Sequence, residues 1–155
     1  LIQEGLSSMD NFASSYMSLT NFEHIYNTNI RPKLEAIDTF LKTTAAPYDI
    51  NAVATLFETT THNILRVMNE LSLTSLDRLS FFTLICHLPH DICHLIQRQW
   101  QYQNAPHYTA EMIAHIYTLN IHKVETAFKE LGVDIVYEHE LMEVFKRIHI
   151  SIFKF

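Results

Sequence analysis

The chain has 155 residues, 48% of them hydrophobic, and its formal net charge at pH 7 is −6. A chain of this length can bury a substantial core, and so apolar a composition argues against disorder. Only two glycines and four prolines occur, so we expect helices joined by short turns rather than strands, which need turn residues. The absence of a run of about 18 apolar residues argues against a membrane span. The negative charge argues against indiscriminate affinity for DNA.

Residues 1–47 are predicted to form an N-terminal helical segment. Its first helix is indicated by apolar side chains spaced three or four apart: Met9, Phe12, Tyr16 and Leu19. Phe22, Ile25 and Tyr26 either extend this helix or begin another. The polar run 27–29 predicts a break, and Pro32 suits the first turn of a new helix. The segment either packs against the core or presents its aromatic stripe as a dimer surface.

Residues 108–131 predict two short helices, 110–117 and 121–131, separated by a tight corner. The predicted inward positions share an apolar or small character: Ile113, Ala114, Tyr117, Leu119, Val124 and Phe128. Asn120 is placed to cap the second helix. This pattern resembles the helix-turn-helix family, in which the second helix of the pair can enter the major groove of DNA. The turn position that the family usually gives to glycine is Thr118.

The same apolar pattern occurs earlier in the chain, in residues 48–71, and aligns with residues 108–131 without a gap. Tyr48 aligns with Tyr108, and Ile64 with Val124. This copy departs further from the family, with Glu58 at the usual glycine. We therefore predict an all-α fold with two helix-turn-helix-like repeats. The expected domains are 1–47, the N-terminal segment; 48–107, the first unit with linker helices; and 108–155, the second unit with a C-terminal helix.

Each unit offers a polar face on its second helix, and the resemblance implies that this face contacts DNA. In the helix predicted at 60–71, inward-facing Ile64, Val67, Met68 and Leu71 leave a polar set outward or at its start: Thr60, Thr61, His62, Asn63 and Arg66. The matching positions of the second unit are Asn120, His122, Lys123 and Thr126. Asparagine can read adenine, arginine can read guanine, and threonine can contact a thymine methyl group or a phosphate. A solvated polar surface is the simpler interpretation of both sets, and residues 108–145 carry a net charge of −5, which disfavours phosphate contact.

The linker between the units contains side chains of the kinds that bind zinc: Cys86, His87, His90, Asp91, Cys93 and His94. Pro89 interrupts the helical register between them, and their spacing matches no zinc-finger pattern. We therefore predict no metal site, while a site built on Cys86, His90 and His94 stays open. Cysteines so close together in sequence do not form a disulfide framework, which favours a cytoplasmic protein.

The C-terminal stretch continues a helical face through Leu141, Val144, Phe145 and Ile148, followed by the apolar residues Ile150, Ile152 and Phe153. Such an end is expected to pack on the core or on a partner. Enzyme signatures are absent: the sequence has no phosphate-binding glycine loop and no nucleophile elbow. Two functions follow, neither of which needs a cofactor. One is a DNA-binding transcriptional regulator that binds double-stranded DNA, expected to be a homodimer. The other is a non-catalytic module that docks on a regulatory or signalling protein.

Overall fold

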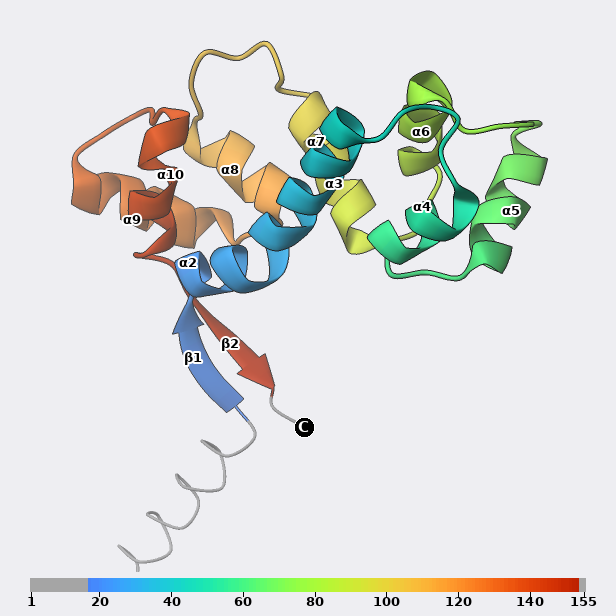
Figure 1. Ribbon diagram of the computed structural model, residues 1–155. Helices are drawn as coiled ribbons and strands as arrows, with labels where there is room; N and C mark the ends of the chain where they lie inside the picture. The colour runs from blue at the N-terminus through green and yellow to red at the C-terminus, as the bar shows by residue number, and fades with distance from the viewer. Residues whose placement is uncertain (1–16, 154–155) are drawn as a thin grey trace, which may run out of the picture. The chain divides into compact units, whose positions relative to one another are not determined.

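The computed structural model describes residues 17–153, which are mostly helical, and the predicted all-α class is confirmed (Figure 1). A small two-stranded ribbon accompanies the helices. None of the helices in the described range is long and apolar enough to cross a membrane. The elements in chain order are β1 (Met17–Asn21), α2 (Phe22–Ile25), η1 (Tyr26–Ile30, a π-helix), α3 (Arg31–Thr43), α4 (Ile50–Leu56), α5 (Thr61–Glu70), α6 (Arg78–Ile85), α7 (Asp91–Trp100), α8 (Ala110–Tyr117), α9 (Ile121–Leu131), η2 (Glu138–Glu140, a 3₁₀-helix), α10 (Leu141–Phe145) and β2 (His149–Phe153).

The described chain folds into two compact units, whose numbers differ from the order of the units predicted from the sequence. Residues 48–71 lie in unit 2, and most of residues 108–131 lie in unit 1. Unit 1 contains residues 17–28, 106–114 and 119–153, and unit 2 contains residues 29–105 and 115–118. The segment predicted as residues 1–47 contributes to both units, because β1 and α2 belong to unit 1 and α3 to unit 2.

Unit 2 is built around a cluster of aromatic rings. Phe81 of α6 is fully buried, and its ring centroid lies 5.5 Å from that of Phe57 and 5.8 Å from those of Phe40 and Tyr48. Ring pairs at these separations stabilise a core beyond the apolar area that they bury. The predicted inward positions of α5 are confirmed, since Ile64, Val67 and Met68 are at most 4% exposed and Leu71 is partly buried.

The core of unit 1 forms where α2 meets the C-terminal helix. The rings of Phe22 and Phe145 meet edge to face at 4.8 Å, and Tyr26 lies 5.3 Å from Phe145. The four residues of the predicted C-terminal helical face are buried, the last of them beyond the end of α10: Leu141, Val144, Phe145 and Ile148.

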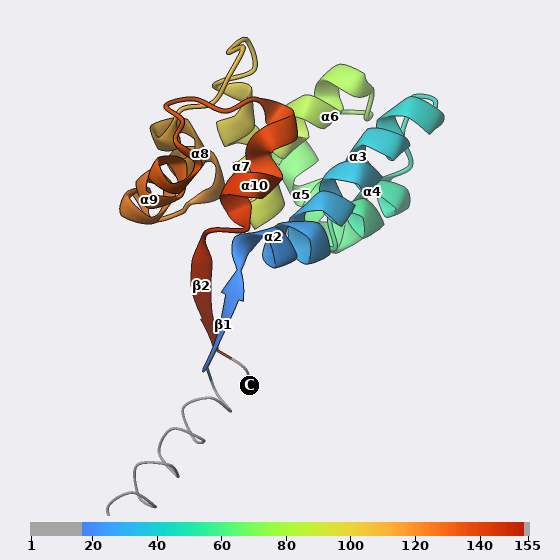
Figure 2. The ribbon, with the colours of Figure 1, turned by 90° about the vertical axis from the view of Figure 1, so that its left-hand side faces the viewer.

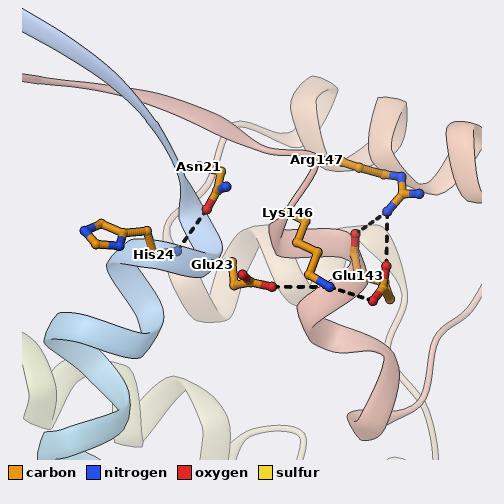
Figure 3. A network of polar contacts seen from close by, with 6 residues as sticks. All are labelled: Asn21, Glu23, His24, Glu143, Lys146 and Arg147. Atoms are coloured by element: carbon orange, nitrogen blue, oxygen red, sulfur yellow. Dashed lines mark hydrogen bonds and ion pairs between the residues drawn. The ribbon is translucent and has the colours of Figure 1, made fainter.

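Polar contacts join the same two elements at the surface of unit 1 (Figure 3). The Lys146 ammonium lies 2.9 Å from a Glu143 carboxylate oxygen and 3.7 Å from a Glu23 carboxylate oxygen. The hydrogen bond from Lys146 holds the pKa of Glu143 below its ordinary value, and the same bond raises the pKa of Lys146. Asn21 caps α2 by accepting a bond from the His24 N–H at 3.0 Å.

The ribbon of β1 and β2 corrects two expectations, that the chain has no strands and that Leu19 belongs to a first helix. Met17 to Asn21 pair antiparallel with His149 to Phe153, with Leu19 opposite Ser151. Figures 1 and 2 both show these strands side by side, leading away from the helices of unit 1. No hairpin turn joins strands so distant in sequence, so turn residues could not reveal them. Met9, Phe12 and Tyr16 lie outside the described residues.

Two predicted interruptions had different outcomes. The break expected at residues 27–29 is wrong, because these residues lie within the π-helix η1 and the chain stays helical into α3. Pro32 does occupy the first turn of α3, as predicted. Pro89 splits the linker as expected, between α6 and α7. Leu79 of α6 is 76% exposed.

Several local features recur at aligned positions of residues 48–71 and 108–131. The Thr59 N–H donates to Ala54 at 2.9 Å, and the Leu119 N–H donates to Ala114 at the same distance. Glu58 and Thr118 have φ angles of 54° and 55°. These are the two turn positions at which the helix-turn-helix pattern expects glycine, and both adopt the left-handed conformation that favours it.

Candidate nucleic-acid interface

Most of the polar residues predicted on α5 bond to nearby residues of unit 2. Thr60 caps the helix by accepting from the Asn63 N–H at 3.1 Å. The Thr61 hydroxyl donates to Asn51 Oδ1 at 3.0 Å, and the Asn63 amide donates to the Thr59 hydroxyl at 3.0 Å. These bonds already occupy the groups that would read bases, so contact with DNA would require them to rearrange.

Of the two remaining candidates on α5, Arg66 also has an internal partner. Its guanidinium lies 3.4 Å from the Glu70 carboxylate, four residues along the helix. His62 is exposed, and no described residue forms a hydrogen bond or ion pair with its side chain. Leu65, between them, is 47% exposed. The surface of α5 is therefore mostly polar, and most of its polar side chains already have partners within unit 2. Leu65 is an apolar side chain among its exposed residues.

The candidates on α9 begin with a capping residue. The Asn120 side-chain oxygen accepts from the N–H groups of His122 and Lys123, at 2.9 and 3.3 Å, so this oxygen holds the helix start. The Thr126 hydroxyl donates to the His122 carbonyl at 2.8 Å. His122 is 85% exposed along its side chain, with Nδ1 3.9 Å from the Glu125 carboxylate. Asn120 is thus mainly a structural cap, whereas His122 and Lys123 project from the first turn.

Three of the predicted residues come together around one depression in the surface of unit 1, which we call the α9 hollow. The hollow has a volume of about 350 Å³ and is lined by Leu19, His122, Lys123, Thr126, Arg147 and His149. Lys123 spans from α9 to the ribbon, where its ammonium donates to the His149 carbonyl at 2.6 Å. The hollow therefore combines the first half of α9 with both strands of the ribbon.

The lining of the α9 hollow is basic. Lys123 and Arg147 carry full positive charges, and the lining contains no carboxylate. Acidic side chains nonetheless lie close by, since Arg147 is 3.5 Å from Glu143 and 3.8 Å from Glu130. The positive potential is thus confined to a small area of an acidic chain, which suits a few phosphate contacts rather than a broad basic surface.

Leu19, Arg147 and His149 were not among the predicted site residues. The positive charge of residues 146–155, with Lys146, Arg147 and Lys154, is a signal for Arg147. No comparable signal exists for Leu19 or His149, because their place beside α9 depends on the pairing of two distant strands.

The cysteine and histidine cluster of the linker is dispersed by the break at Pro89. Within residues 17–153, no three histidine, cysteine, aspartate or glutamate side chains are grouped so that they could hold a metal ion. Cys86 is exposed and Cys93 is buried, and both thiols are free. Burial raises the pKa of the Cys93 thiol to about 12, so this thiol stays protonated at neutral pH and acts as a small apolar core residue.

Comparisons with protein-family models, curated proteins and solved structures find no match to this chain.

Proposed function

We propose that the protein binds double-stranded DNA through unit 1, with the first half of α9 and the adjoining ribbon as the contact surface. The observation that carries this proposal is the α9 hollow, where Lys123 and Arg147 meet without an acidic lining residue. In a helix-turn-helix the second helix presents its N-terminal residues to the DNA. On α9 these residues are His122 and Lys123.

The proposed roles follow from the positively charged side chains that line the α9 hollow. The Lys123 ammonium has three donors and gives one to His149, so it can still contact a phosphate. Arg147 is 34% exposed along its side chain and faces the same hollow. Positively charged side chains that neutralise phosphates supply affinity without sequence preference. His122 and the amide group of Asn120 are the proposed base-reading side chains, at the start of the helix.

We also infer that the two units are copies of one helix-turn-helix-like element. Support comes from backbone contacts that recur at aligned positions. Tyr48 N donates to Leu76 O at 2.7 Å, and Tyr108 N donates to Val136 O at 2.8 Å. In this interpretation the copies have diverged, with α9 retained for DNA and α5 adapted to another task. A transcriptional regulator of this kind would act in the cytoplasm, as a homodimer that matches two half-sites.

The experiment is a fluorescence-anisotropy titration of the full chain with a labelled random-sequence duplex at low salt. We expect binding that weakens as salt is raised, because bound counterions are released from the phosphates. Lys123→Gln should weaken binding by about tenfold, which corresponds to roughly 1.4 kcal/mol. Lys129→Gln is the matched control, since Lys129 is exposed on the last turn of the same helix and outside the α9 hollow.

Two results would count against the DNA proposal. One is the absence of binding at low salt, and the other is an equal loss in the Lys123 and Lys129 variants. Either result would favour the second candidate function, a docking module for a regulatory or signalling protein. The observation that supports this alternative is the exposure of Leu65 on α5 and of Leu79 on α6, at 47% and 76%.

A further inference from the structure

A second concave site lies in unit 2 and shares no lining residue with the α9 hollow, and we call it the α7 cavity. Its volume is about 430 Å³, within the range of cavities that hold small molecules. Lys33 of α3 forms part of its wall, together with residues of α7, the last residue of α8 and the residue that follows it. These further lining residues are Asp91, His94, Arg98, Tyr117 and Thr118.

Arg98 is the feature of the α7 cavity that points to a ligand. It is partly buried, and its Nε–H donates to the Ile116 carbonyl at 2.8 Å. This bond fixes the plane of the guanidinium and leaves its two terminal nitrogens available. Among residues 17–153 no carboxylate forms an ion pair with Arg98, although Asp91 lines the same cavity. A partly buried guanidinium is normally paired, so an anion in the cavity would supply the partner.

The rest of the lining also favours a small anion. Lys33 adds a second positive charge, and its ammonium is only loosely engaged, 3.7 Å from the Glu58 carboxylate. With Asp91 as the one acid among the lining residues, the formal charge of the cavity wall is positive in a chain whose net charge is −6. The first turn of α7 contributes Asp91 and Ile92 to the wall. His90 precedes this turn without making a side-chain cap. The free backbone N–H groups of the first turn of α7 therefore add to the positive potential.

We propose that the α7 cavity binds a small anion bearing a carboxylate or phosphate group, with Arg98 as its fixed donor and Lys33 as its second cation. Arginine suits this role because its planar donors match the oxygens of both groups. The proposal concerns unit 2 and does not depend on DNA binding by unit 1.

The test is an NMR titration of the ¹⁵N-labelled full chain, first with inorganic phosphate and then with succinate, at constant ionic strength. We expect saturable shifts of amides at the start of α3, along α7 and at residues 116–118. Saturation by phosphate alone would identify a phosphate ligand, and saturation by succinate alone a carboxylate. Shifts that do not saturate with either probe, or that scatter over the surface, would overturn the proposal.

Two variants connect the binding to the named side chains. Lys33→Gln should weaken the affinity of the probe that binds by about tenfold or more, as loss of a charged hydrogen bond does. Lys42→Gln is the control, because Lys42 also lies on α3 and also pairs with one carboxylate, that of Asp38, but is outside the cavity. Arg98→Gln should abolish binding, provided that the NMR spectrum of this variant is that of a folded protein. Wild-type affinity in Lys33→Gln, or an equal loss in Lys42→Gln, would refute the assignment.

Discussion

Helices α5 and α9 begin in the same way and differ in the surface that they expose. Each starts after a side-chain cap, Thr60 or Asn120, and each buries an aliphatic residue at its fourth position, Ile64 or Val124. On α5 the polar side chains bond within unit 2. On α9 the first turn opens onto a basic hollow beside the ribbon. The comparison teaches that two helices with the same cap position and buried positions can expose different surfaces, because burial constrains only the residues that face inward.

The largest expected effect on stability comes from alanine substitutions at one pair of aligned core positions, one in each unit. Phe81→Ala in unit 2 should lower the free energy of unfolding by about 4 kcal/mol, and Leu141→Ala in unit 1 by about 3 kcal/mol. Phe81 is fully buried against three other rings, whereas Leu141 is the smaller side chain at the aligned position of unit 1. Urea denaturation measures both. A cost below about 1 kcal/mol for Phe81→Ala would contradict the described core.

A smaller effect is expected where α5 and α9 end. Ser72 and Gly132 occupy matched left-handed positions, with φ angles of 58° and 69°. Gly132→Ser should cost about 1 kcal/mol, and Ser72→Gly should stabilise by about half as much, because glycine adopts this conformation without a steric penalty. A Cβ at Gly132 would meet nothing within 4 Å, so the backbone alone is tested. Thermal unfolding of both variants measures the effect, and shifts of the same sign would contradict the matched geometry.

The smallest expected effect is on the pH dependence of stability, where an acidic cap occurs in unit 2 and not at the aligned position of unit 1. Asp77 caps α6 by accepting the Ser80 N–H at 2.7 Å, and this bond holds the pKa of Asp77 below its ordinary value. A lowered carboxyl pKa stabilises the fold above the ordinary value and loses that contribution as the pH falls through the folded value. The matched residue in unit 1 is Tyr137. Asp77→Asn keeps a cap without a charge, so its stability should fall less than that of the wild type between about pH 5 and pH 2. Parallel pH curves in chemical denaturation would refute this role of Asp77.

The sequence predicts the parts of this molecule that depend on local periodicity. The bounds of α8 and α9 match those expected from apolar spacing, and the cap at Asn120 follows from its place before α9. The ribbon could not be predicted in the same way, because Leu19 and Ser151 pair across most of the length of the chain and no turn residue records that contact.

The candidate site was predictable to the same extent. His122, Lys123 and Thr126 were found on one helix face, where spacing defines neighbours. Arg147 and His149 join them only through tertiary packing. On α5 the sequence indicated polar exposed residues correctly for His62 and Arg66, but it could not show that Thr61 and Asn63 bond to Asn51 and Thr59.

The central claim is that DNA contact belongs to α9 and not to α5, and one measurement tests it most directly. The dependence of duplex affinity on salt should be compared in the wild type, Lys123→Gln and Arg66→Gln. With two phosphate contacts, the slope of log affinity against log salt should be about −2 in the wild type. It should fall in magnitude by about one in Lys123→Gln and stay unchanged in Arg66→Gln. A slope that changes in Arg66→Gln and not in Lys123→Gln would contradict the account.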